Sequence, residues 1–133
     1  MQTKPVLSLS EINAILEAAQ QEAEANGWVV TIAVADDGGH PLGLRRLDGA
    51  APMSSYVATE KARSAAVGRK ETKVFEEMIN GGRSAFLSAP LEGLLEGGVP
   101  VIVDGQVIGA VGVSGVKSDQ DAQIAKAGIA AIG

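Results

Sequence analysis

The stretch GGVPVIVDGQVIGAVGVSG, residues 97–115, decides the fold of this chain. Apolar and β-branched residues on either side of Asp104-Gly105 predict two strands, over 99–103 and 106–113. Asp-Gly is a strong signal for a tight hairpin, because a type I′ turn needs positive φ at both of its central residues. The stretch therefore predicts an antiparallel hairpin.

Three glycines within this stretch, Gly109, Gly112 and Gly115, have the spacing GxxGxxG. A dinucleotide site needs GxGxxG between a strand and a helix, and a Walker loop needs Gly-Lys followed by Ser or Thr. Since neither pattern is present, we interpret these glycines as positions where a helix or a neighbouring backbone packs closely on the strand. Ser114, at the end of the strand, is a candidate to contact a ligand.

A second hairpin is predicted earlier in the chain. Residues 28–35 form a β-branched run, and 41–47 return as its partner strand. The turn between them is Asp36-Asp37-Gly38-Gly39, whose glycines accept positive φ.

Helices are predicted around and between the two hairpins. Ser8 and Glu11 fit a capping box at the start of the first helix, and Ser118 with Asp121 is expected to cap the last one. The region 83–97 is expected to be mostly loop. The predicted helices span 9–26, 52–68, 72–79 and Ser118 to the carboxyl end.

The predicted order is α β β α α β β α, which lacks the alternation of strands and helices that builds a parallel sheet. This order favours an α+β fold in which an antiparallel sheet of two hairpins is flanked by helices. At 133 residues the chain is long enough for one core and short for two. We expect a single domain over residues 1–133.

The composition predicts a thin core. Hydrophobic residues make up 46% of the chain but aromatic ones only 3%, so Ala, Val, Ile and Leu must form the interior. Small side chains bury little apolar area and leave a modest margin of stability. We therefore expect association into a homo-oligomer, a dimer or larger.

The charge and cysteine content exclude several classes of function. Eleven Lys and Arg against sixteen Asp and Glu give a net charge of −5, with no dense basic run, so nucleic acid is not an expected partner. The absence of cysteine excludes disulfides and thiolate sites. No signal-like or membrane-spanning apolar run is present, so we expect a cytoplasmic protein without a membrane partner.

His40 is the only histidine, so any histidine-based metal site depends on it. A tetrahedral zinc site would need its other ligands from carboxylates alone, whereas one imidazole suffices as an axial ligand of haem iron. His40 is therefore a candidate haem iron ligand. The alternative is an exposed turn residue without a ligand.

Arginines and a lysine are the other candidate ligand-binding residues. Arg45 and Arg46 end the second predicted strand, where an arginine fork suits a carboxylate or a haem propionate. Because successive strand residues face opposite sides, we expect only one of them to share a given pocket. The alternative is an ion pair with Asp48. Lys61 interrupts a stripe of small residues on its helix, so it either reaches solvent or is paired at a pocket or interface.

Four stretches together resemble the GlcG/HbpS family, also called the haem-degrading family, and the carboxyl-terminal domain of PduO-type proteins. They are VADDGGHPLGLRRLDGA at 34–50, EKARSAAVGRK at 60–70, the stretch 97–115, and SDQDAQIAKAG at 118–128. The resemblance implies a profilin-like sheet between helices, assembly into dimers or larger oligomers, and haem as a cofactor. The motifs are mostly structural, so they identify the fold more strongly than the activity.

The resulting hypothesis is a small oligomeric protein that binds haem or assists its degradation. Its ligand, haem or another planar or carboxylate-bearing molecule, is expected in a cleft near the first hairpin and the helix that carries Lys61. His40, Arg45 or Arg46, Lys61 and Ser114 are expected around it. Two alternatives remain open. One is an enzyme or accessory protein for a small hydroxy acid or aldehyde of glycolate or diol metabolism, with Lys61 as electrophile or base. The other is a structural oligomer without a ligand.

Overall fold

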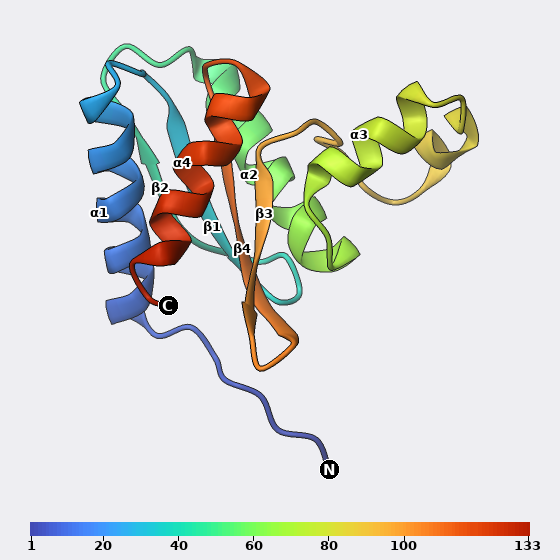
Figure 1. Cartoon of the computed structure of the whole chain (residues 1–133), viewed down its shortest axis with the longest axis horizontal. Helices are drawn as coiled ribbons and strands as arrows, with labels where there is room; N and C mark the ends of the chain where they lie inside the picture. Colours follow the sequence, from blue (N-terminus) through green and yellow to red (C-terminus); the bar gives the residue numbers. More distant parts are fainter.

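The computed structural model describes all residues, 1–133, and confirms the predicted α+β class and element order (Figure 1). The elements are α1 (Leu9–Ala25), β1 (Thr31–Asp36), β2 (Pro41–Arg46), α2 (Pro52–Gly68), α3 (Thr72–Asn80), the 3₁₀ helix η1 (Ser84–Ser88), β3 (Gly98–Val103), β4 (Gln106–Ser114) and α4 (Ser118–Ala130). Within the region expected to be mostly loop, η1 is the one regular element. None of the helices combines the length and apolar character needed to cross a membrane.

The four strands form one antiparallel sheet in the order β2-β1-β4-β3. Each hairpin contributes one central strand and one edge strand, and the hairpins join where β1 pairs with β4. The turn of the second hairpin is as predicted, because Asp104 and Gly105 have φ of 51° and 76°. The first turn also lies where it was predicted, and of its two glycines Gly39 takes positive φ, at 82°. The Asp36 side chain holds the rest of that turn.

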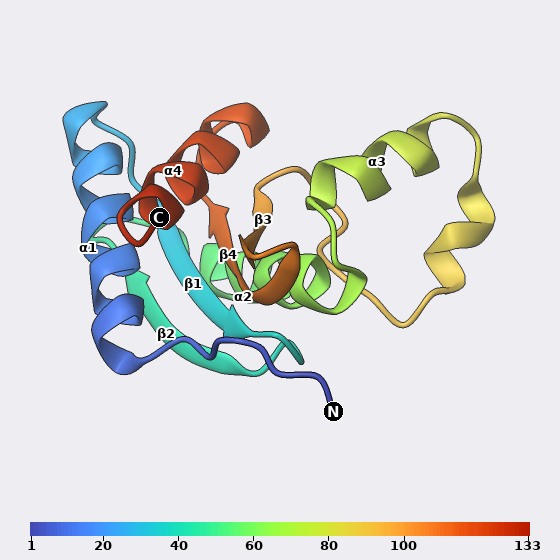
Figure 2. The same ribbon diagram turned by 60° about the horizontal axis from the view of Figure 1, so that its bottom comes forward.

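Helices cover both faces of the sheet. Helices α1 and α4 pack side by side on one face, and α2 lies across the other, mainly over β4 and β1 (Figures 1 and 2). The α1/α4 side holds the large aliphatic core, which includes Ile15, Ile32 and Ile124. The α2 side is packed through small residues such as Ala33, Ala58 and Ala62. On the α1/α4 side the helices thus pack on the sheet through large aliphatic side chains. On the α2 side, which we call the close layer, small residues bring the helix backbone unusually near the strands.

Gly112 accounts for the close layer on the α2 side. A Cβ at this position would overlap the carbonyl oxygen of Ala58 and the backbone nitrogen of Ala62. Only a residue without a side chain allows the helix backbone to come this near the strand. The prediction that the glycines of β4 mark close backbone packing is confirmed.

The start of α4 differs from the sequence prediction. Lys117, not Ser118, occupies the position before the first helical turn, and its backbone N–H donates to Oε1 of Gln120 at 3.3 Å. Asp121 points inward, where its Oδ1 accepts the N–H of Val116 at 3.2 Å. The expected Ser118 and Asp121 cap is therefore wrong, because Asp121 is drawn into the interior by a partner on another helix.

Helix α3 and η1 stand out from the body of the protein as an arm (Figure 2). The rings of Phe75 and Phe86 stack with centroids 5.3 Å apart and hold the two pieces together. Phe75 also packs against α2, since a Cβ on Gly68 would lie 2.5 Å from its Cζ. The arm is thus fastened to the body near its base.

Candidate functional site

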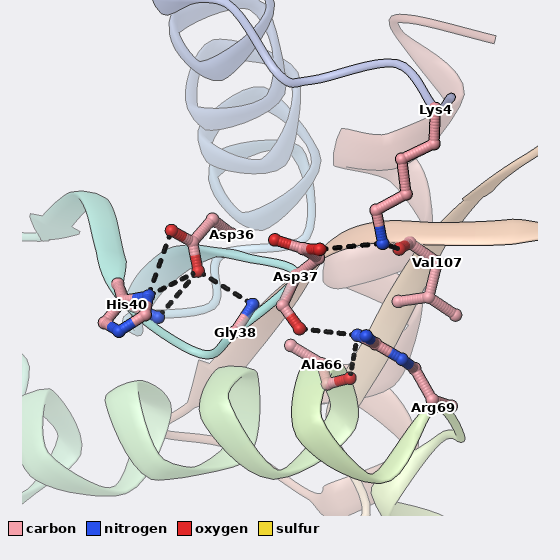
Figure 3. Close-up of polar contacts among 8 residues, drawn as sticks. All are labelled: Lys4, Asp36, Asp37, Gly38, His40, Ala66, Arg69 and Val107. Carbon is pink, nitrogen blue, oxygen red and sulfur yellow. Dashed lines mark hydrogen bonds and ion pairs between the residues drawn. The ribbon is translucent and has the colours of Figure 1, made fainter. Parts of the chain in front are cut away.

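The only histidine is held by a carboxylate in the β1–β2 turn. Nδ1 of His40 lies 3.0 Å from Oδ1 and 3.2 Å from Oδ2 of Asp36 (Figure 3). The same Oδ1 accepts the backbone N–H groups of Gly38 and His40, each at 2.9 Å. One carboxylate therefore shapes the turn and orients the imidazole together.

The contacts around Asp36 keep its carboxylate ionised, and an ionised carboxylate can hold the Nδ1 proton of His40. Burial alone would raise the pKa of Asp36, but the hydrogen bonds from His40 and Gly38 outweigh it and lower that pKa. An ionised Asp36 accepts the proton of Nδ1, which leaves the lone pair on Nε2. Metal-binding histidines are commonly oriented in this way. The His40 side chain is 77% exposed, so Nε2 is accessible to a ligand.

Helix α2 supplies the surroundings of this turn. Gly39 lies against α2, where a Cβ would come within 2.8 Å of Cγ of Arg63 and 2.9 Å of Cγ2 of Val67. Arg63 is partly exposed and its only carboxylate partner is Glu60, at 3.5 Å. Val67 is an exposed apolar side chain. A cation and an apolar side chain therefore lie against the residue next to His40, although sequence reasoning did not single out Arg63.

The neighbouring residue Asp37 ties the turn to two other parts of the chain. Its carboxylate lies 2.7 Å from Nζ of Lys4, which also donates to the carbonyl of Val107 at 2.9 Å (Figure 3). Arg69, which follows α2 with φ of 61°, donates to the carbonyl oxygens of Asp37 and Ala66. The turn that presents His40 is thus fixed from the amino-terminal segment and from α2.

Arg45 and Arg46 lie elsewhere, in an open pocket of about 530 Å³. The pocket is formed by the end of α1, the loop that contains Trp28, and the end of β2. Both residues border this pocket, but successive side chains of a strand leave it on opposite faces, and Nε of Arg46 donates to the carbonyl of Ala50, just before α2. Arg45 pairs with Glu17, at 2.8 Å, and not with Asp48. We call this the arginine pocket.

The arginine pocket and the His40 turn are separate on one chain. His40 precedes the first residue of β2, and Arg46 is its last residue. At about 3.3 Å per residue, the strand places them roughly 17 Å or more apart. The structure therefore does not bring His40 and the two arginines together.

Lys61 and Ser114 line no pocket of the structure. Nζ of Lys61 is buried and donates to the carbonyl of Val113 at 2.9 Å and to Oδ2 of Asp121 at 3.1 Å. Burial raises the pKa of Asp121, an effect that the positive charge of Lys61 opposes. Ser114 pairs across the sheet with Thr31. We assign Lys61 to the stability of the fold.

The chain has clear relatives. A family model described as "Haem degrading protein HbpS-like" matches residues 7–130. Protein GlcG of Escherichia coli strain K12 is 61% identical over 114 residues, which cover 86% of this chain and 85% of GlcG. Corrinoid adenosyltransferase PduO of Salmonella typhimurium is 30% identical over 136 residues, which cover 98% of this chain and 40% of PduO.

Solved structures with the same fold include a haem complex. The crystal structure of HbpS matches with a TM-score of 0.90 and 30% identity, over 100% of this chain and 94% of that one. The crystal structure of the PduOC:heme complex matches with a TM-score of 0.85 and 27% identity, over 96% of this chain and 95% of that one.

Proposed function

Because the chain belongs to the HbpS-like family of haem-degrading proteins, we propose that it binds haem, with Nε2 of His40 as the ligand of the iron. The observation that carries this proposal is the Asp36–His40 pair. A carboxylate that accepts the Nδ1 proton fixes the ring and makes Nε2 a stronger donor to a metal. The solved PduOC:heme complex, which shares this fold, supports haem as the ligand.

The residue types beside the His40 turn are those that a haem would need. Val67, beside Gly39, offers an exposed apolar contact to a porphyrin face, and the guanidinium of Arg63 suits a propionate. We propose Arg63 as the propionate partner in place of Arg45 and Arg46, which lie at the far end of β2. Bound haem would supply a redox-active iron, and the residues of this chain would hold its ligand in place and neutralise its carboxylates.

We also propose that the protein works as a homo-oligomer. Its exposed large apolar side chains lie on several elements, and they include Met53, Tyr56, Leu87 and Leu95. Contact with further copies would remove these side chains from water and would supplement the thin core. Light scattering coupled to size-exclusion chromatography should give a mass that is a multiple of the chain mass, and a monomer at micromolar concentration would overturn this part.

A haem titration tests the main proposal. We expect a saturable Soret band with a defined stoichiometry in the wild type and its loss or a marked shift in His40→Ala. Asn13→Ala is the control, because it removes an exposed polar side chain on α1. Arg63→Gln should keep the Soret position and weaken binding, since it removes only a propionate contact.

Two results would contradict the proposal. A spectrum of His40→Ala identical to that of the wild type would remove His40 as the ligand. No saturable binding by the wild type would remove haem, and it would favour a structural oligomer without a ligand.

A further inference from the structure

A pocket at one end of the sheet combines two cations with no acidic residue. It is an open space of about 410 Å³ between the amino-terminal segment, Arg69 and the turn that joins β3 to β4, and its charged lining residues are Lys4 and Arg69. The other pockets either include a carboxylate or contain no charged residue. In a chain with a net charge of −5, this is the pocket whose charge favours an anion. We call it the basic pocket.

The two cations meet at one residue, Asp37. Nζ of Lys4 lies 2.7 Å from Oδ2 of Asp37, and Nη1 of Arg69 donates to the backbone oxygen of the same residue. Figure 3 shows both side chains on the side of Asp37 that faces Val107, away from His40. Nζ of Lys4 also donates to the carbonyl of Val107, which borders the pocket. The ammonium and the guanidinium are therefore held close together at this pocket by contacts of their own.

The charge of Arg69 is fixed in place and uncompensated. Its Nη1 donates to the carbonyl oxygens of Asp37 and Ala66, and it forms no ion pair. Those bonds orient the guanidinium, while Nε and Nη2 keep their donors. Arg69 also has φ of 61°, in the left-handed region where glycine commonly follows a helix. Glycine would suit that backbone better, so what the arginine adds at this position is its side chain.

Lys4 also keeps a donor for a ligand. An ammonium group has three N–H donors, and Lys4 uses two of them, on Asp37 and on the carbonyl of Val107. Its side chain is 30% exposed, so the third donor is accessible from the pocket. The carboxylate of Asp37 compensates the charge of Lys4 but pairs with no other cation. One net positive charge, that of Arg69, therefore remains at the pocket.

We propose that the basic pocket binds a phosphate group. The phosphate of an ester has three terminal oxygens and a charge of about −1.5 to −2 at pH 7. The fork of Arg69 suits two of these oxygens, and Lys4, as a point charge, suits the third. Gln106 and Ile102 also border the pocket and can contact the organic part of an ester. The site uses neither His40 nor haem, so it does not depend on the proposed function.

Calorimetric titration of the haem-free protein tests the proposal. The ligands are inorganic phosphate, glycerol 3-phosphate and acetate, at constant ionic strength because salt screens exposed charges. We expect saturable binding of the phosphate ligands and binding at least about tenfold weaker for acetate, which has one oxygen and one charge fewer. Tighter binding of glycerol 3-phosphate would assign the site to an ester, and equal or tighter binding of inorganic phosphate would assign it to the free ion.

Variants identify the groups involved. Arg69→Gln should weaken phosphate binding by about tenfold or more, and Arg69→Lys should recover part of the loss, because it keeps the charge without the fork. Gln106→Glu should weaken binding as well, because it adds a negative charge to the pocket and leaves both cations in place. The matched controls are Arg83→Gln, on the arm, and Asn13→Asp on α1, since both positions are exposed and neither borders the pocket. His40→Ala should bind phosphate as the wild type does, which separates this site from the haem proposal.

Three results would overturn the inference. The first is wild-type protein that releases no heat with either phosphate ligand and whose melting temperature neither ligand raises. The second is unchanged phosphate affinity in Arg69→Gln, which would leave Arg69 only its bonds to the turn. If that variant does not fold, unchanged affinity in Gln106→Glu has the same meaning. The third is acetate binding as tight as that of phosphate.

Discussion

Nζ of Lys61 lies 3.1 Å from Oδ2 of Asp121, and both side chains are 3% exposed. The pair joins α2, on one face of the sheet, to the first turn of α4 on the other. It passes beside Gly97, where a Cβ would lie 2.7 Å from Nζ. An ion pair inside the protein therefore links the two helix layers.

Removal of one partner should be costly, because it leaves the other buried and uncompensated. We expect Lys61→Met to lower the free energy of unfolding by about 3–5 kcal/mol, measured by urea denaturation. The double variant Lys61→Met/Asp121→Asn should recover part of the loss. Lys73→Met is the control, since its exposed pair with Glu77 should change stability by no more than about 0.5 kcal/mol. A loss below about 1 kcal/mol in Lys61→Met would show that the pair contributes little.

The carboxylate behind His40 should influence haem binding without touching haem. Asp36→Asn keeps the size of the side chain but removes the charge that accepts the Nδ1 proton. We expect haem affinity to fall about 10- to 100-fold, as for other partners of metal-bound histidines. Asp104→Asn, at an exposed turn that tolerates Asn, should bind haem normally. Equal affinities for the wild type and Asp36→Asn would argue against this role of Asp36.

The Asp37–Lys4 pair should make stability depend on pH in the acid range. The hydrogen bond from Lys4 lowers the pKa of Asp37, although burial opposes the effect. A carboxyl group with a lowered pKa stabilises the folded state above its ordinary pKa, and this contribution is lost as the pH falls through the lowered value. At pH 7 the free energy of unfolding of Asp37→Asn should therefore be about 0.2–1 kcal/mol lower than that of the wild type, and its melting temperature should be lower as well.

Thermal melts between pH 7 and pH 2 test this expectation. The difference between wild type and Asp37→Asn should shrink toward the acid end, where Asp37 of the wild type is also protonated. Lys4→Met should show the same narrowing. A difference that stays constant down to pH 2 would mean that Asp37 acts through its shape and not through its charge.

The contact between Gly112 and α2 should tolerate no side chain. Gly112→Ala forces a methyl group into the backbone of Ala58 and Ala62, neither of which can move without shifting the helix. We expect a loss of about 3 kcal/mol in the free energy of unfolding, or failure to fold. Gly133→Ala, where the nearest atom lies 3.9 Å from the new methyl group, is the control. A Gly112→Ala protein as stable as the wild type would contradict the close packing of this layer.

Features that depend on neighbours along the chain were predictable from the sequence. The Ser8–Glu11 capping box and the Asp104-Gly105 turn each involve residues within three positions, and both are confirmed. Asp121 was not predictable in this way. Its partner Lys61 lies 60 positions earlier, so local reasoning assigned Asp121 to a helix cap.

The candidate sites show the same limit. His40 and the arginines were recognised by residue type, but their separation depends on the length and direction of β2. Trp28 and Glu24 border the arginine pocket because the end of α1 packs beside the end of β2. Arg63 lies against Gly39, the residue before His40, only because α2 packs on the β1–β2 turn. Each of these contacts depends on how helices and strands pack in three dimensions, and a local sequence pattern does not contain that information.

The pairing of β1 with β4 affects how the protein folds during its synthesis. It pairs residues from opposite ends of the chain, such as Thr31 with Ser114. The strands of each hairpin are neighbours along the chain, but β1 leaves the ribosome with one edge unpaired until β4, the last strand, has been synthesised. Such distant pairing makes folding slow and leaves an apolar strand edge open to wrong partners in the meantime. A nascent chain of this protein is therefore most vulnerable to aggregation just before its carboxyl-terminal hairpin emerges.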